Sequence, residues 1–315
     1  MSFYVSRGQQ AVANRYGIYI AGVDGTGMRA ILTSATRQLT HPRVSPDRNL
    51  VAFTRYTIPG ADGLAKEADG YLGSEVCTCA IDGSDVRVVV PPGPTELNVC
   101  TSWWAGQHEV VHLHIDPFSR VYQIRAVDRR TLAIRVLPTP AGLNVSDPSL
   151  RDGRITFSVK AAPDPLWIMN ADGGAARQIT SPTGAGSSGG LNFGDYDSQI
   201  SPDGERVAFM RWMGGWFSIH VLELSTGVVT LLSPQTGTIS EGLPTWSPDG
   251  RRIAFVRFDL TNLVGENSGI FTMARDGSDR QRIPVPFGLF PSFPCYLPGD
   301  GSRVSFNAEN YMMNV

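Results

Sequence analysis

The sequence predicts an all-β protein, a six-bladed β-propeller whose closing blade is built from both ends of the chain. One observation is a strand signature, S-P-D-G-x-R followed by V or I and then A-F, which occurs at residues 201–211 and 247–257 and in a degenerate form at residues 45–55. A second is the spacing of equivalent positions, 45 to 59 residues apart, which is typical of blades with four short strands. A third is a composition with 34 Gly and 22 Pro, which fits a protein rich in turns.

The first half of each repeat is aligned on one aromatic position, the Phe of A-F in the signature. Weaker copies of the signature surround two further phenylalanines, and a copy at residues 103–114 has a histidine in the same position. Each copy predicts two antiparallel strands joined by a tight turn. In chain order the six anchor residues are Phe53, His112, Phe157, Phe209, Phe255 and Phe306.

The second half of a repeat alternates apolar and polar residues and in four copies then reaches Asp-Gly, while the copies at residues 121–128 and 219–227 match more loosely. This pattern predicts a strand, a hairpin turn and a return strand, which completes a four-stranded antiparallel blade. On this alignment Cys77 and His220 fall in a slot that other blades fill with Tyr19, Tyr122 or Trp167, which indicates a structural role for both. The second halves lie at residues 17–25, 76–83, 121–128, 166–173, 219–227 and 269–277.

The two ends of the chain each carry half of a repeat. The first complete element is a second half at residues 17–33, and the last is a first half that ends near Asn307. Joining them gives a sixth blade, closes the ring and removes exposed sheet edges. We therefore expect an N-terminal extension at residues 1–16 and a single propeller domain at residues 17–315.

These motifs resemble the repeats of TolB-type propellers, W-S-P-D-G-[KR]-x-I-A-F followed by I-Y-V-M-D-x-D-G. The match is strongest at residues 246–257 with 269–277, is weakest in blade 2, and extends over about residues 17 to 309. The resemblance implies a TolB-like six-bladed β-propeller. It implies much less about activity, because this architecture serves as protein scaffold, polysaccharide lyase and peptidase gate.

Composition narrows the range of partners and compartments. A net charge of −2 argues against a nucleic-acid partner, which would need a basic face, and no apolar run reaches the length of a membrane span. We expect a monomer, located in the cytoplasm as the sequence is written because residues 1–15 lack a leader pattern. TolB itself is periplasmic, so removal of a signal peptide would instead make this protein periplasmic or secreted.

Candidate functional residues are those that break the repeat. His112 replaces Phe, and His114, on the same strand face, occupies a slot that three other blades fill with arginine. The resulting group, Arg55, His114, Arg211 and Arg257, is predicted to surround one mouth of the ring and to recognise an anion, since guanidinium pairs well with carboxylate. The alternative is that each arginine pairs with an acidic neighbour as a brace between blades.

The same mouth receives the beginnings of the innermost strands. There the alignment brings together His41, Cys100, Asp147, Asp197, Leu243 and Pro294, with Tyr196 and Glu241 close by. Neighbouring carboxylates can hold a cation or divide acid and base roles, and they can equally hydrate a channel filled with water. We predict no cofactor and assign no metal ligands, a metal bound at the mouth being the less favoured alternative.

The loops at this mouth are unequal, with long insertions at residues 56–75 and 259–268. In the loop of blade 4, Trp212 and Trp216 flank two glycines. Exposed loop aromatics are typical of a stacking platform for a sugar ring or a peptide side chain. The alternative is that both rings fold inward and cover the blade.

No nucleophile motif supports hydrolysis. Residues 108–112 spell H-E-x-x-H, but on a strand the two histidines would lie about 13 Å apart and would not share a zinc ion. The leading interpretation is a propeller that binds a small anionic or saccharide ligand, or a protein partner, at one mouth. The alternative is an enzyme, a lyase or hydrolase acting on an anionic saccharide or another carboxylate there, with His41, His112 and His114 as candidate catalytic residues.

Overall fold

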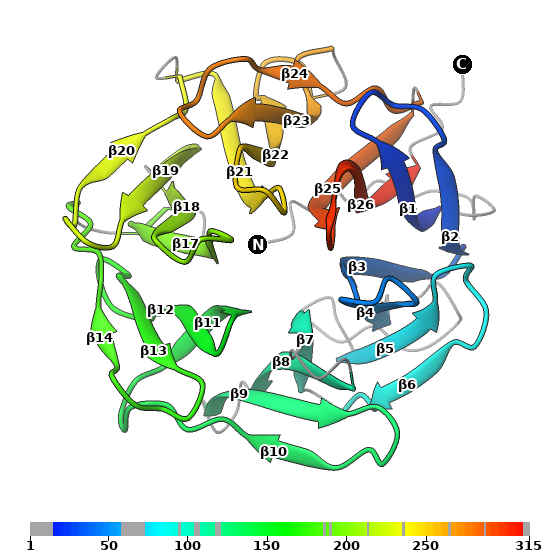
Figure 1. Ribbon diagram of the computed structural model, residues 1–315, viewed down its shortest axis with the longest axis horizontal. Helices are drawn as coiled ribbons and strands as arrows, with labels where there is room; N and C mark the ends of the chain where they lie inside the picture. The colour runs from blue at the N-terminus through cyan, green and yellow to red at the C-terminus, as the bar shows by residue number, and fades with distance from the viewer. Residues whose placement is uncertain are drawn as a thin grey trace.

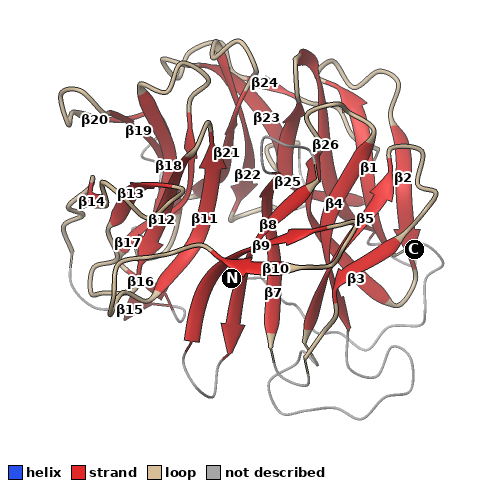
Figure 2. Ribbon diagram, turned by 60° about the horizontal axis from the view of Figure 1, so that its bottom comes forward, coloured by secondary structure: helices blue, strands red, loops and turns tan. Residues whose placement is uncertain are grey.

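A computed structural model of the chain shows six four-stranded antiparallel sheets arranged as blades around a central axis (Figure 1). None of the described residues is helical, so none forms a helix long and apolar enough to cross a membrane (Figure 2). The prediction of an all-β, six-bladed propeller is confirmed. The structure describes residues 15–57, 73–93, 96–103, 108–116, 121–184, 187–188, 191–212, 214–234, 237–263, 266–286 and 288–310.

Each of the first five blades is one continuous stretch of chain whose first strand lies nearest the axis (Figure 1). Blade 1 contains β3 (Arg37–Val44), β4 (Leu50–Thr57), β5 (Ser74–Ala80) and β6 (Arg87–Val90). Blade 2 contains β7 (Leu97–Trp103), β8 (Glu109–Asp116), β9 (Val121–Asp128) and β10 (Ile134–Val136), and blade 3 contains β11 (Val145–Arg151), β12 (Arg154–Val159), β13 (Leu166–Asn170) and β14 (Arg177–Gln178). Blade 4 contains β17 (Gly194–Ile200), β18 (Arg206–Trp212), β19 (Phe217–Glu223) and β20 (Val229–Leu231), and blade 5 contains β21 (Ile239–Trp246), β22 (Arg252–Asp259), β23 (Gly269–Ala274) and β24 (Gln281–Arg282).

The sixth blade joins the two ends of the described chain, as predicted. Its strands are β25 (Leu289–Leu297), β26 (Asp300–Asn310), β1 (Tyr16–Gly22) and β2 (Arg29–Ser34), in the sheet order β2-β1-β26-β25. Tyr19 on β1 lies opposite Phe306 on β26, which is the register that the repeat requires. A small hairpin that the sequence did not predict, β15 (Ser187–Ser188) with β16 (Leu191–Asn192), lies between blades 3 and 4 in the sequence.

The S-P-D-G signature closes the hairpin between the first two strands of a blade. In blade 4 the Ser201 hydroxyl donates to Asp203 Oδ1 at 2.5 Å and accepts from the backbone N–H of Arg206 at 2.9 Å. In blade 5 the Ser247 hydroxyl makes the equivalent bond to Asp249 Oδ1 at 2.6 Å. The serine therefore satisfies a backbone donor that the turn would otherwise leave without a partner.

The anchor residues all lie in the interior, each opposite one residue of the next strand. The five phenylalanine anchors and His112 are fully buried, and burying one phenylalanine contributes about 1.5–3 kcal/mol. The prediction that Tyr122 shares the aromatic slot is wrong, because Tyr122 lies opposite Ile115 and Arg125 lies opposite His112. The opposing pairs are Phe53 with Cys77, His112 with Arg125, Phe157 with Trp167, Phe209 with His220, Phe255 with Phe271, and Phe306 with Tyr19.

Candidate functional site

The innermost strands bulge towards the axis, and in five blades the bulge holds a residue other than glycine in the left-handed backbone region. The irregularity is built into each strand, since its register with the second strand shifts at this point. We call these residues the tip residues. They are His41, Asp147, Asp197, Leu243 and Phe293, with φ between 45° and 55°.

Four tip residues precede a proline. Aspartate and histidine tolerate a left-handed conformation better than leucine and phenylalanine do, so Leu243 and Phe293 carry backbone strain. In blade 6 the tip is Phe293 and not Pro294, which corrects the alignment of that blade by one residue. In blade 2 the shift lies between Cys100 and Ser102, and no described residue of that strand has a positive φ.

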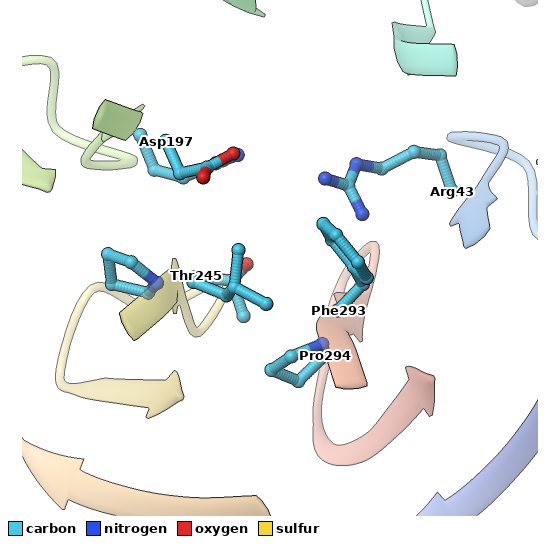
Figure 3. A pocket seen from close by; sticks show the side chains of 8 residues that line it. Arg43, Asp197, Thr245, Phe293 and Pro294 are labelled. Carbon is cyan, nitrogen blue, oxygen red and sulfur yellow. The ribbon is translucent and has the colours of Figure 1, made fainter. Parts of the chain in front are cut away.

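Three tip residues, Asp197, Leu243 and Phe293, line a cavity in the axial channel together with some of their neighbours (Figure 3). Asp197 and Arg43 project into it from opposite walls, with Thr245 and Phe293 beside them. Arg43 is held in place because its Nε donates to the Thr101 carbonyl at 2.9 Å. The cavity has a volume of only about 20 Å³, which is room for one or two water molecules or a small ion. A larger ligand would therefore sit over a mouth of the channel.

Two tip carboxylates share one sector of the channel. Burial in the channel, together with the neighbouring Asp147 carboxylate, raises the pKa of Asp197 to about 7. The guanidinium of Arg43 and the ammonium of Lys160 partly oppose this rise. Asp197 therefore takes up a proton more readily than an aspartate in water does.

His41 is the tip residue of blade 1, and its ring packs against Phe293. Its ring centroid is 3.8 Å from that of Phe293, and its Nδ1 lies 2.8 Å from the Thr40 hydroxyl. Burial, followed by repulsion from Arg43, lowers the pKa of His41 well below its usual range. The imidazole is neutral under ordinary conditions.

The three arginines predicted to surround the mouth are each held by a buried carboxylate. Arg211 donates from Nε and Nη2 to the two oxygens of Asp195 at 2.6 and 3.0 Å. Arg257 donates from Nε to Glu241 Oε1 at 2.7 Å, and Arg55 donates from Nε to Glu75 Oε1 at 2.5 Å.

The surroundings of these pairs favour the brace. Asp195 and Glu241 are fully buried and Glu75 nearly so, while 16–23% of each arginine side chain is exposed. Most of the guanidinium charge is thus compensated within the protein, and one edge of each group still reaches solvent. The brace accounts for these contacts, and Glu241 additionally bonds Arg280 Nη1 at 2.7 Å.

Of the two tryptophans predicted to form an aromatic platform, Trp212 is buried and Trp216 is partly exposed. Trp212 is the last residue of β18 and is buried, its ring 4.7 Å from that of Phe217. Tyr196 packs in the same cluster and donates its hydroxyl to Asp164 Oδ2 at 2.8 Å. Trp216 is half-buried, so of the residues predicted for stacking it alone keeps a surface open to a ligand.

His112 and His114 lie on one face of β8, as predicted, and both are buried. His114 Nδ1 lies 3.0 Å from Asn98 Oδ1, whereas neither ring nitrogen of His112 has a hydrogen-bond partner among the described residues. Burial, with the charge of Arg125, lowers the pKa of His112 to about 3 and also lowers the pKa of His114. Four of the five residues of H-E-x-x-H belong to β8, and His108 directly precedes it, so the motif is not on the helix that zinc chelation by both histidines requires.

Sequence reasoning missed Arg43, Phe293 and Arg125. The recurring X-Pro dipeptides at the tips would have aligned blade 6 correctly and would have placed Arg43 two residues beyond a tip. No three His, Cys, Asp or Glu side chains gather in a metal-binding arrangement within the described ranges.

Comparison with known proteins supports the fold. No family model matches the chain. An uncharacterized protein of Agrobacterium fabrum is 26% identical over 118 residues, which cover 34% of this chain and 37% of that protein, so little more than a third of the relative is spanned.

Among solved structures, a putative TolB from Agrobacterium tumefaciens superposes with a TM-score of 0.69 at 14% identity, covering 95% of this chain and 99% of that one. TolB from Acinetobacter baumannii gives a TM-score of 0.62 at 15% identity, covering 95% of this chain and 61% of that one. An oligogalacturonate lyase from Vibrio parahaemolyticus gives 0.50 at 12% identity, covering 90% and 80%. At these identities the likeness shows the fold alone, a TolB-like six-bladed β-propeller.

Proposed function

We propose that the chain is a binding propeller, which recognises a small anionic or saccharide ligand, or a protein partner, at the mouth of its axial channel. The observation that carries this proposal is the pair of charged side chains, Asp197 and Arg43, directed into the channel from opposite walls (Figure 3). Charged groups that converge in a concave site fix the orientation of a ligand. Because the cavity in the channel has room for only one or two water molecules, the ligand itself would sit over the mouth.

The surroundings of the mouth support the same proposal. Arg55, Arg211 and Arg257 are fixed by their carboxylates, so their exposed edges are preorganised and lose little side-chain freedom on binding. Trp216 adds a partly exposed aromatic surface. Fixed guanidinium edges together with an aromatic ring suit a carboxylate-bearing sugar or an acidic segment of a protein.

The test is to identify what co-purifies with the protein. The intact chain and the variants Asp197→Asn and Arg43→Gln are purified in parallel, and bound small molecules and proteins are identified by mass spectrometry. A species that is stoichiometric in the wild type and depleted in both variants supports the proposal. The same species at the same level in all three proteins, or in none of them, would contradict it.

An acid–base enzyme is the second candidate, and the pKa of Asp197 favours it. A carboxyl group with a pKa of about 7 can both donate and accept a proton at neutral pH, and the Asp147 carboxylate lies beside it. Because an oligogalacturonate lyase shares the fold, oligogalacturonate is the anionic saccharide to test first. Formation of an unsaturated product that disappears in Asp197→Asn would favour the enzyme, and binding without product would favour the binding protein.

A further inference from the structure

Two rows of paired side chains in blade 2 differ in charge and polarity from the same rows in other blades. In blades 4 and 5 an arginine on the second strand lies opposite a carboxylate on the first, as Arg257 lies opposite Glu241. In blade 2 this row is His114 opposite Asn98, a neutral pair. The neighbouring row is Phe opposite Cys or an aromatic side chain in the other five blades, and in blade 2 it is His112 opposite Arg125. In blade 2 the positive charge therefore lies in the row that is apolar in other blades, and not in the row where a carboxylate faces it.

Arg125 forms no ion pair with a carboxylate among the described residues, and only the more distant charge of Glu96 acts on it. Its Nε and Nη2 both donate to Gln123 Oε1, at 2.9 and 2.7 Å. Burial lowers the pKa of Arg125, and the charge of Glu96 only partly opposes that effect. Arg55 is the contrasting case, because its ion pair with Glu75 overcomes burial and raises the pKa of the guanidinium. A half-buried guanidinium without a carboxylate partner favours an anion from outside the chain.

His112 lies directly across from Arg125. It is fully buried, and neither ring nitrogen makes a hydrogen bond of good geometry within the described ranges, since the Val110 backbone acts on the ring only weakly. A neutral imidazole presents one N–H donor and one acceptor, and leaving them unsatisfied in the interior is unfavourable. An anion bound to Arg125 would accept a hydrogen bond from this N–H, which would relieve both deficits at once.

His114 has a different role on the same face. The Asn98 amide donates to the Ser74 carbonyl at 3.3 Å, so its oxygen accepts from Nδ1 of His114 at 3.0 Å. The proton of the neutral ring is then on Nδ1, which makes Nε2 an acceptor. Ser74 belongs to blade 1, so this chain of bonds places the polar rows at the interface between blades 1 and 2. An acceptor next to an anion site suits a hydroxyl group beside the anionic group.

We propose that the interface between blades 1 and 2 binds the carboxylate group of a small organic acid, with Arg125 as the charged anchor, His112 as a hydrogen-bond donor and His114 as an acceptor for a neighbouring hydroxyl. Carboxylate is the class that matches one planar guanidinium with one additional donor. A hydroxy acid or a sugar acid matches all three side chains. This site is separate from the channel cavity, which is lined by Arg43 and Asp197 and by none of these three side chains.

The experiment is a titration of protein labelled with ¹⁵N-histidine, followed by NMR, using sodium acetate and sodium galacturonate at constant pH and ionic strength. Galactose is the uncharged control for the sugar ring. We expect saturable shifts of the His112 ring signals with both acids, tighter binding of galacturonate than of acetate, and no shift with galactose. The His112→Phe variant assigns the signals.

Variants separate this site from the surface and from the channel. Arg125→Gln is expected to weaken galacturonate binding at least tenfold, and Arg125→Lys to weaken it less. Arg135→Gln is the matched control, since it removes the same charge from an exposed strand of the same blade. Equal binding in Arg125→Gln and wild type, no saturable shift in the wild type, or loss of binding only in Arg43→Gln would each overturn the proposal. If Arg125→Gln does not fold, the lysine variant and the galactose comparison decide the question.

Discussion

Replacing His112 with phenylalanine tests how a departure from the repeat is tolerated. The other five blades use Phe in this position, and each of those rings is fully buried. The substitution therefore restores the residue that the architecture favours, and it removes two ring nitrogens that make no hydrogen bond of good geometry with the described residues. We expect His112→Phe to stabilise the folded protein and to weaken binding of a carboxylate at this interface.

The magnitude follows from three contributions. A buried polar group without a hydrogen bond costs about 1–3 kcal/mol, and His112 carries such groups with none of its surface exposed. Burying a phenyl ring contributes about 1.5–3 kcal/mol. Against these stands about 1–3 kcal/mol for fitting a larger ring opposite Arg125. With the middle of each range, the expected net gain in the free energy of unfolding is about 2 kcal/mol.

The pH dependence provides a second readout. Because burial lowers the pKa of His112 to about 3, the unfolded chain, with a histidine pKa of about 6.5, binds the proton more readily than the folded chain does. Wild-type stability therefore falls as the pH decreases from about 6.5 towards 3, and the phenylalanine variant lacks this component. The advantage of the variant should grow in acid. Part of the slope remains, because burial also lowers the pKa of His220 to about 4.

Chemical denaturation at several pH values is the assay, with His108→Gln as control because His108 is exposed. The reasoning fails if His112→Phe is less stable than wild type near neutral pH, or if its pH dependence is unchanged. Either result would mean that the imidazole is better satisfied than its surroundings indicate.

Four further changes have definite expectations. Glu241→Gln should cost about 3 kcal/mol in denaturant unfolding, because it leaves two half-buried arginines without their shared buried carboxylate, whereas Glu309→Gln, whose ion pair is partly exposed, should cost less than about 1 kcal/mol. Asp197→Asn should be more stable than wild type above about pH 7 and should lose that advantage towards pH 4, since a raised carboxyl pKa makes the wild type less stable as the pH rises; equal pH profiles would contradict this. Leu243→Asn should gain up to about 1 kcal/mol by relieving the left-handed backbone, and a less stable variant would show that channel packing outweighs strain. Deleting residues 15–34 removes β1 and β2, so calorimetry should find no cooperative transition, and an unchanged melting profile would mean that the ring does not need its closing strands.

The fold was predictable because the repeat fixes both the period and the strand register. The error in blade 2 has a local cause. In other blades the Asp of Asp-Gly lies in the turn, and counting back from it finds the aromatic slot, whereas Asp128 is still part of β9 and accepts from the backbone N–H of Arg130. Five residues before Asp128 lies Gln123, next to the predicted Tyr122, although Arg125 occupies the slot.

The candidate site was less predictable from the sequence, because it depends on strand bulges and side-chain contacts that the alternation of apolar and polar residues does not encode. A bulge inserts residues into one strand and changes which side chains face the channel, so Arg43 could not be assigned to the channel from periodicity alone. The ion pairs of the arginines with Asp195 and Glu75 depend likewise on which carboxylate comes within bonding distance across a blade. Sequence supplied the residue types, and only the assembled sheet decided which charges are compensated.

A closed ring makes it feasible for one blade to lose apolar packing. Every blade contacts two neighbours, and closure through β1 and β26 means that no single interface is a free edge from which the sheet unravels. An interface with His112 and Arg125 in its apolar row can therefore be weak while five phenylalanine rows support the ring. Local rules that a fold otherwise obeys are most often broken where the residues serve a function. Among the residues that the structure describes, the break consists of a guanidinium without an ion pair opposite an imidazole without a hydrogen bond of good geometry, which is the combination that an external carboxylate would complete.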